Sequence, residues 1–147
     1  FKALLEFHNS SKGSATLAVC RLKGPVEAKD FGTLELAGNK KIIAYHEKTV
    51  GAGHKVVYVN AGIYCFNKEI FGLMPRPKAF SIEQEFFAKV LNQSGRKRGM
   101  ETDQDPQLAQ LHPFFGFEVE ETFIDIGTPE RYEQAKKFFG KVSKHQK

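Results

Sequence analysis

The chain has 147 residues, of which 41% are hydrophobic and 27% are charged, a balance that is typical of a globular domain with a core and that argues against disorder. The formal net charge of +5 would suit any phosphate-bearing partner, such as a small substrate, an anionic membrane or nucleic acid. No basic motif with interleaved aromatic residues of the RNA-binding kind occurs. We expect neither a nucleic-acid nor a membrane partner, and a nucleic-acid or membrane-surface module that uses the basic residues 96–98 and 136–147 is the minority alternative.

The first expected elements are a helix, a strand and a hairpin. Apolar residues at helical spacing predict a helix over residues 1–8, which a cluster of turn formers then ends. The apolar run 15–21 predicts a buried strand of the kind found in parallel sheets. Two alternating runs, 31–36 and 41–46, flank Gly38-Asn39 and predict a β-hairpin.

The residue pattern in the middle of the chain predicts one strand, one helix and a loop. Residues 56–66 form a strand-like run that Asn60-Ala61-Gly62 interrupts, which predicts a bend or a close backbone approach. Ser81 followed by Gln84 has the order of a capping box and predicts a helix to about Leu91. Residues 93–112 carry glycine, proline and mixed charges, and we expect a surface loop there.

The end of the chain predicts a last strand and a last helix. Residues 115–120 form the strand. Thr128 is a candidate N-cap, Pro129 suits the first helical position, and Glu130 complements the positive end of the helix dipole. Gly140 is a candidate stop. Strands interleaved with helices predict an α/β fold with a mixed, mainly parallel sheet flanked by helices.

The two cysteines, Cys20 and Cys65, lie in strand-like runs with no CxxC partner and no histidine cluster nearby, so no metal framework is expected. Two such thiols suit a reducing compartment, although a disulfide between them stays open. No apolar run reaches membrane-spanning length and no signal peptide is found, so we expect a cytoplasmic protein. The chain begins with Phe1 rather than Met, which favours a fragment of a longer protein.

Asp125 is the first candidate for chemistry. It lies in an apolar run immediately before Gly127 and a predicted helix start. A carboxylate at the end of a buried strand is costly unless it is paired, hydrogen-bonded or bound to a cation, and ligands of open α/β sheets gather at strand carboxyl ends. On spacing alone, a helix cap or an ion pair with a core arginine is the favoured alternative.

Other candidates are polar residues at strand ends and turns. Glu47 and Lys48 follow a hairpin strand, and an adjacent acid and base would point to opposite faces, where lysine suits a phosphate. Asn60 can both donate to and accept from a sugar hydroxyl. Glu83 lies in the first turn of a predicted helix. Taken alone, these residues are more often a solvated strand end, a bend and a dipole-complementing charge.

Several kinds of chemistry are absent from the sequence. Neither GxxxxGK[ST] nor GxGxxG occurs. The five histidines show no metal-ligand spacing, and no Ser/His/Asp or Cys/His arrangement stands out. The residues alone therefore predict an α/β domain with a site for an anion and a polyol.

A set of motifs in register extends this interpretation. They are Phe31-Gly-x-Leu-Glu-Leu, Ile42-Ile-x-x-x-x-Glu47-Lys48, Val59-Asn60-Ala61-Gly62-Ile63-Tyr64, Ser81-Ile-Glu83 and Phe123-Ile-Asp-Ile-Gly-Thr-Pro-Glu-Arg-Tyr132. In order and spacing, nearly the whole chain resembles the later half of the sugar-1-phosphate nucleotidyltransferase family. The pattern is most similar to the heptose-1-phosphate and mannose-1-phosphate guanylyltransferase branches.

The resemblance implies a sugar-phosphate site. Glu47 would bind sugar hydroxyls and Lys48 the sugar phosphate, so that Lys48 is a catalytic as well as a binding residue. Asn60 and Gly62 would line the sugar pocket, and Glu83 would be their neighbour. Thr49 replaces the proline that usually follows Glu-Lys, which leaves the turn there less fixed.

The resemblance also implies a reaction and a metal. Asp125 would ligate Mg²⁺ as a catalytic residue, and the sugar-phosphate oxygen would attack the α-phosphorus of a nucleoside triphosphate, GTP being the one expected, and release pyrophosphate. Such a displacement depends on positioning and charge neutralisation. Residues 1–140 would form the C-terminal, sugar-phosphate-binding part of a Rossmann-like nucleotidyltransferase domain, and residues 141–147 a basic tail.

One departure from the family limits these expectations. The Gly-rich loop that binds the triphosphate and a second metal-binding Asp do not occur in these 147 residues. The expected partners are therefore the sugar 1-phosphate, the nucleoside triphosphate and a missing N-terminal half of the same enzyme, with a homo-oligomer left open. A non-catalytic nucleotide-sugar sensor or regulatory subunit of the same fold is the alternative.

Overall fold

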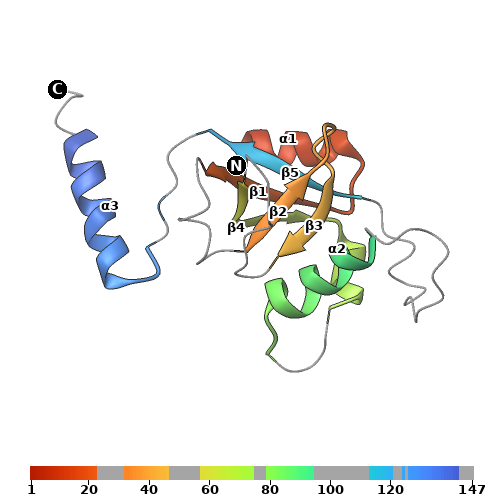
Figure 1. Cartoon of the computed structure of the whole chain (residues 1–147). Helices are drawn as coiled ribbons and strands as arrows, with labels where there is room; N and C mark the ends of the chain where they lie inside the picture. The colour runs from red at the N-terminus through yellow and green to blue at the C-terminus, as the bar shows by residue number, and fades with distance from the viewer. Residues whose placement is uncertain are drawn as a thin grey trace.

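The computed structural model describes residues 1–22, 32–46, 57–74, 79–94, 113–120, 124 and 126–142 (Figure 1). In chain order the elements are the helix α1 (Lys2–Ser11), the strands β1 (Ala15–Leu22), β2 (Thr33–Leu36), β3 (Ile42–His46) and β4 (Val57–Phe66), the 3₁₀-helix η2 (Lys68–Gly72), the π-helix η3 (Ile82–Phe87), the helix α2 (Ala88–Ser94), the strand β5 (Phe114–Val119) and the helix α3 (Pro129–Val142).

The strands form one mixed sheet in the order β3-β2-β4-β1-β5. The mixed α/β fold expected from the sequence is therefore confirmed. Within the described strands, however, only β1 and β5 run parallel, and the pairs β1–β4, β2–β3 and β2–β4 are antiparallel. The sheet is thus less parallel than expected: a short hairpin turn joins β2 to β3, and β4, which follows β3 in the chain, lies between β2 and β1 and runs antiparallel to both.

The sheet is buried on both faces, which explains the continuous apolar run of β1. Alternate residues of a strand point to opposite faces. Leu17 and Val19 accordingly pack into the larger core cluster with η3 and α2, whereas Ala18 and Cys20 pack into a second cluster with Leu4 of α1. Figure 1 shows α1 and α2 on opposite sides of the sheet.

A buried histidine joins α1 to the sheet. His8 Nδ1 lies 2.9 Å from the Thr16 hydroxyl and His8 Nε2 lies 3.1 Å from Asn67 Oδ1. The Asn67 amide nitrogen donates to the Gly13 carbonyl, which turns its oxygen toward the histidine. Since Asn67 Oδ1 can only accept, His8 Nε2 donates to it, and in the neutral tautomer that this bond selects Nδ1 accepts from Thr16. This network fixes α1 to the ends of β1 and β4.

The structure differs from the expected element boundaries mainly at the ends of helices and at the hairpin turn. The first helix runs to Ser11, beyond the expected turn at residues 9–13, and ends where Lys12 adopts a left-handed φ of 54°. The hairpin forms as expected, but its positive φ falls on Lys40 rather than on the glycine before it. The last helix continues past Gly140 to Val142.

The helix predicted from Ser81 forms as two segments. Ser81 is the N-cap, and its hydroxyl accepts from the Gln84 backbone N–H at 3.2 Å, as the capping box predicts. In return, the Ser81 backbone N–H donates to Glu85 Oε1 at 2.9 Å rather than to the Gln84 side chain. The first turn is a π-helix, which widens the turn, and α2 follows it. Within the expected loop 93–112, residues 93–94 belong to α2, and the rest lie outside the described residues.

Helix α3 begins as expected and lies apart from the sheet in Figure 1. The Thr128 hydroxyl accepts from the Arg131 backbone N–H at 3.3 Å. The backbone N–H of Glu130 and the Thr128 hydroxyl hold the pKa of the Glu130 carboxyl below its ordinary value. Of the α3 side chains that the structure describes, only Ala135 is buried, and Tyr132 and Phe139 on the same expected face are about half exposed.

Both cysteines are free, which excludes the disulfide left open by the sequence. Cys20 is buried, and this burial raises the pKa of its thiol. In the parts of the chain that the structure describes, no helix is long and apolar enough to cross a membrane.

Candidate functional site on the β4 bulge

The interruption predicted in the fourth strand is a bulge. Leu17 of β1 pairs with Tyr64 of β4, and Val19 pairs with Asn60, so two steps along β1 face four steps along β4. The bulge places Gly62 at a φ of 71°, in the left-handed region. The predicted bend is therefore confirmed, and bulges of this kind re-aim side chains next to binding and catalytic sites.

The bulge brings together three of the residues proposed from the sequence. Asn60 Oδ1 accepts from the Gly62 backbone N–H at 3.0 Å, and Asn60 Nδ2 donates to the Tyr64 hydroxyl at 2.7 Å. The Tyr64 hydroxyl donates to Glu83 Oε1 at 2.9 Å, and the Ser81 hydroxyl donates to Glu83 Oε2 at 3.2 Å. We call Asn60, Gly62, Tyr64, Ser81 and Glu83 the bulge cluster.

The Tyr64 ring anchors this cluster in the larger core. Its centroid lies 5.6 Å from that of Phe66 in a stacked arrangement and 5.1 Å from that of Phe87 in an edge-on one. Burial first, and then the neighbouring Glu83 carboxylate, raises the pKa of the Tyr64 hydroxyl well above its ordinary value, although the bond from Asn60 lowers it. The hydroxyl therefore stays protonated and acts as a fixed donor.

This raised pKa predicts a loss of stability in alkali. The folded state keeps the Tyr64 proton at a pH where the unfolded state, with a pKa of about 10, releases it. The contribution of Tyr64 to stability is therefore complete below pH about 10 and is lost as the pH rises further. Between pH 10 and 11, the wild-type free energy of unfolding should fall by about 1 kcal/mol more than that of Tyr64→Phe, as urea titrations at the two pH values will measure. Equal losses in the two proteins would contradict the assignment.

Gly62 supports a second prediction. A Cβ added at Gly62 meets no atom within 4 Å, so Gly62→Ala tests only the backbone conformation. A left-handed φ costs an L-residue about 1–2 kcal/mol, from which the smaller entropy of the unfolded alanine chain subtracts a part. We expect a net loss of about 1 kcal/mol by urea unfolding. The control is Gly38→Ala, which also adds its Cβ in open space and has no positive φ; a loss equal to that of Gly62→Ala would refute the conformational explanation.

The register of the sheet aligns the end of β3 with the bulge. His46 pairs with Thr33 of β2, and Thr33 pairs with Val59 of β4, the residue before Asn60. His46 Nε2 also lies 2.8 Å from Glu35 Oε1, which holds the strand end in place. Glu47 and Lys48, which directly follow His46 in the chain, lie outside the described residues.

The proposed metal ligand is also outside the described residues. Asp125 is not described, although its neighbours Ile124 and Ile126 are. Across the residues that the structure does describe, no three His, Cys, Asp or Glu side chains are grouped so that they could hold a metal ion. The assignment of Asp125 to Mg²⁺ therefore stays a prediction.

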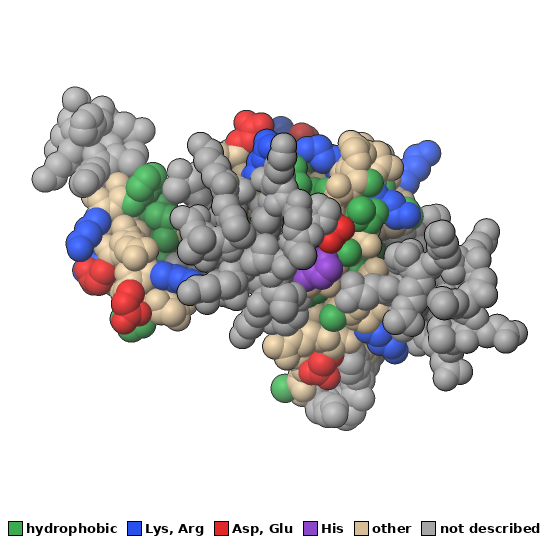
Figure 2. All heavy atoms as spheres, viewed as in Figure 1, with side chains coloured by type: hydrophobic (Ala, Val, Ile, Leu, Met, Phe, Trp, Pro, Cys, Tyr) green, Lys and Arg blue, Asp and Glu red, His purple; other side chains and the backbone are tan. Residues whose placement is uncertain are grey.

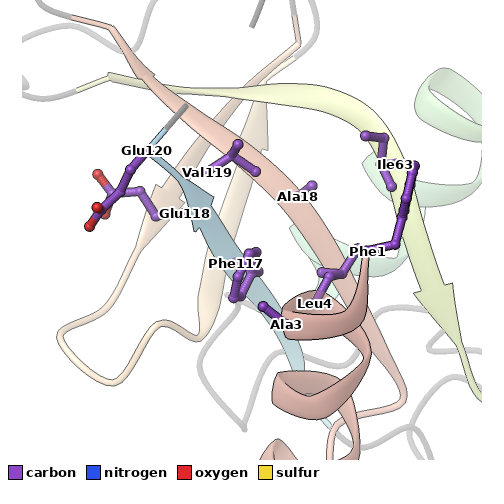
Figure 3. A pocket seen from close by; sticks show the side chains of 9 residues that line it. All are labelled: Phe1, Ala3, Leu4, Ala18, Ile63, Phe117, Glu118, Val119 and Glu120. Carbon is purple, nitrogen blue, oxygen red and sulfur yellow. The ribbon is translucent and has the colours of Figure 1, made fainter. Parts of the chain in front are cut away.

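A separate pocket of about 600 Å³ lies on the α1 side of the sheet. Figure 3 shows its lining, in which apolar side chains such as Phe1, Leu4 and Phe117 dominate and Glu118 and Glu120 lie at one end. The Glu118 carboxylate already pairs with a lysine, Lys40, at 3.4 Å. An apolar wall with acidic side chains repels a phosphate, so this pocket is a poorer candidate for a sugar phosphate than the bulge cluster.

The charges on the visible surface are dispersed. Figure 2 shows the described Lys and Arg side chains at several separate places, with acidic side chains among them. On this face, and for the described residues, there is no continuous basic stripe of the kind that tracks a nucleic-acid backbone.

Tyr64 and Ser81 were not among the site residues expected from the sequence. A signal for Tyr64 was present, because Asn60 and Tyr64 are four residues apart on one strand and so share a face. Because the bulge inserts two residues, an even number, it leaves the Asn60 and Tyr64 side chains on the same face of the sheet. Ser81 was interpreted only as a helix cap, and its second bond to Glu83 depends on the tertiary arrangement of η3 and β4.

Together, the fold and the bulge cluster define an α/β domain that presents a polar, hydrogen-bonded site on a strand bulge. A sequence profile of the nucleotidyl transferase family matches residues 1–141. The chain therefore belongs to the nucleotidyl transferase family, as the motifs had indicated.

Curated relatives agree with this assignment. The chain is 31% identical over 136 residues to D-glycero-alpha-D-manno-heptose 1-phosphate guanylyltransferase of Aneurinibacillus thermoaerophilus, covering 92% of this chain and 48% of that protein. It is 26% identical over 129 residues to mannose-1-phosphate guanylyltransferase of Mycobacterium tuberculosis, covering 88% of this chain and 30% of that protein. The chain thus spans half or less of the length of these relatives.

The structure of HddC from Yersinia pseudotuberculosis complexed with GMP-PN has a similar fold. The TM-score is 0.57 at 23% sequence identity, over 92% of this chain and 48% of that one. At this identity the likeness supports the fold.

Proposed function

We propose that the protein containing this chain is a sugar-1-phosphate nucleotidyltransferase, with GTP as the nucleotide and a heptose or mannose 1-phosphate as the acceptor. The membership of the chain in the nucleotidyl transferase family carries the proposal, and the names of the two guanylyltransferase relatives supply the substrates. Residues 1–140 would form the sugar-phosphate-binding part of the domain, and residues 141–147 its basic tail.

The bulge cluster supports a role in sugar binding. Asn60 is partly buried. Its amide bonds to Gly62 and Tyr64 and, with respect to the described residues, retains one N–H and one oxygen lone pair. Gly62 is exposed, and its Cβ position is open. One donor and one acceptor beside open space are what a sugar hydroxyl requires. Glu47 would add a second hydroxyl contact.

In the proposed reaction, an oxygen of the sugar phosphate attacks the α-phosphorus of GTP. A new P–O bond forms there, the bond from the α-phosphorus to the bridging oxygen of the β-phosphate breaks, and pyrophosphate leaves. Lys48 would hold the attacking phosphate in line with the bond that breaks. Such orientation of the reactants lowers the activation free energy of a displacement substantially. Mg²⁺ bound at Asp125 would neutralise charge on the phosphates.

Pyrophosphate release by the complete protein tests the proposal. GTP, ATP, UTP and dTTP are each combined with mannose 1-phosphate, glucose 1-phosphate or heptose 1-phosphate in the presence of Mg²⁺. Release that requires both substrates, fastest with GTP and a mannose or heptose phosphate, is the expected result. No turnover with any pair overturns the proposal, and binding without turnover would favour the nucleotide-sugar sensor instead.

A further inference from the structure

We infer that Tyr64 and Glu83 are positioning residues that fix the orientation of the Asn60 side-chain amide. The inference about the amide follows from the hydrogen bonds of the bulge cluster. Its consequence for sugar binding rests on the proposed function.

The carboxylate of Glu83 sets the direction of the chain of bonds. An ionised carboxylate only accepts hydrogen bonds. The Tyr64 hydroxyl, 2.9 Å from Glu83 Oε1, must therefore point its single proton at Glu83. Tyr64 is protonated because it is buried beside this anion. Its oxygen can then only accept from its other neighbour.

The amide of Asn60 is consequently held from both ends. On one side, Tyr64 offers only lone pairs, so the amide nitrogen must face it, at 2.7 Å. On the other side, the backbone N–H of Gly62 needs an acceptor, so the amide oxygen must face it, at 3.0 Å. A flipped amide would place N–H against N–H and oxygen against oxygen. The free N–H and the free lone pair therefore point in fixed directions.

Glu83 acts through Tyr64 in this arrangement. Its Oε1 accepts from Tyr64 and its Oε2 accepts from the Ser81 hydroxyl at 3.2 Å. Both carboxylate oxygens are thus engaged by the protein, which favours a supporting role for Glu83 over a direct contact with the sugar. Ser81, as the N-cap of η3, ties this support to the start of a helix.

Tyr64→Phe in the complete protein is the first test, because it removes only the hydroxyl and keeps the ring against Phe66 and Phe87. We expect the KM for the sugar phosphate to rise about tenfold, with the KM for the nucleotide and kcat within about twofold of wild type. In the ¹H–¹⁵N spectrum, the Asn60 side-chain amide should move and exchange faster with water. Tyr58→Phe is the control, because Tyr58 lies on the same strand and its hydroxyl makes no bond to the bulge cluster.

The outcomes separate this inference from the proposed function. If the wild-type protein turns over no substrate pair, the proposed function fails, and the Asn60 amide signals alone decide the inference. Unchanged Asn60 signals in Tyr64→Phe overturn it, as does a KM for the sugar phosphate equal to that of wild type.

A reversal of the bonds is the second test and does not depend on activity. Asn60→Asp places a second carboxylate against Tyr64, which has one proton for two anions, so the melting temperature should fall. Adding Glu83→Gln reverses the bonds. The new amide at position 83 donates to the Tyr64 oxygen, so the Tyr64 proton is free to point at the carboxylate at position 60. The other oxygen of that carboxylate still accepts from the Gly62 backbone N–H. The double variant should recover most of the lost melting temperature. Losses that simply add would overturn the inference.

Discussion

Phe87→Ala is expected to lower the free energy of unfolding by about 3–5 kcal/mol, the largest effect on stability that we predict. Phe87 is completely buried. Its ring centroid lies 5.1 Å from that of Tyr64, 6.1 Å from that of Tyr45 and 6.4 Å from that of Phe114. The Phe87 ring therefore packs against aromatic rings from three strands. An alanine leaves a cavity that these side chains cannot all collapse into, and the cost is the lost burial plus the cavity.

Urea unfolding followed by circular dichroism measures this effect, and Phe139→Ala is the matched control. Phe139 lies on α3 and is 54% exposed, so the same change of side chain should alter stability by no more than about 0.5 kcal/mol. Because Phe87 also supports the Tyr64 ring, the proposed function predicts that the folded Phe87→Ala protein binds sugar phosphate more weakly. A loss from Phe87→Ala no greater than that from Phe139→Ala would contradict the core assignment.

The sequence predicted most of the fold because most of its elements have local causes. The hairpin around Gly38-Asn39 follows from turn chemistry, and the start of α3 follows from the cap at Thr128. The π-helical first turn of η3 was not predictable. Its two phenylalanines, Phe86 and Phe87, both lie in the larger core cluster, and tertiary packing of this kind can override local helix preferences.

The direction of the strands was predicted less well for the same reason. The apolar run of β1 correctly indicated burial on both faces, but such a run occurs in any strand covered by helices on two sides. Its main partner, β4, is antiparallel, and only β5 is parallel to it. Burial can be read from composition, whereas strand direction depends on the path of the chain between strands.

The candidate site was predictable in its residue types and not in its connections. Asn60 was selected from a turn-like triplet inside a strand and Gly62 from the family resemblance, and the bulge explains why that triplet occurs there. The bond from Tyr64 to Glu83 joins residues 19 positions apart in the sequence, so only the folded chain reveals it. Glu47, Lys48 and Asp125 lie outside the described residues, and their roles rest on their positions at predicted strand ends and on the family resemblance.

Lys48→Met should lower kcat/KM for the sugar phosphate about 100-fold in the complete protein, the largest effect on activity that we predict. In the proposed reaction, the ammonium group of Lys48 holds the attacking phosphate. Methionine keeps much of the side-chain length but removes the charge and all three donors. The KM for the nucleotide should stay within about twofold of wild type, because the lost contact is to the sugar phosphate. Initial rates of pyrophosphate release, with each substrate varied in turn, measure both quantities.

Lys40→Met is the control for this change, because it removes the same charge from the turn of the same hairpin. Lys40 Nζ pairs with Glu118 at 3.4 Å on the surface, with a side chain that is about half exposed. Exposed pairs of this kind contribute at most about 1 kcal/mol to stability, and none of the proposed substrate contacts involves Lys40. Its kcat/KM should therefore remain within about twofold of wild type. Equal losses of kcat/KM in the two variants would contradict a specific contact between Lys48 and the phosphate. They would mean that the net positive charge of this region attracts the substrate. Raising the ionic strength should then abolish the losses in both variants, because salt screens such an attraction.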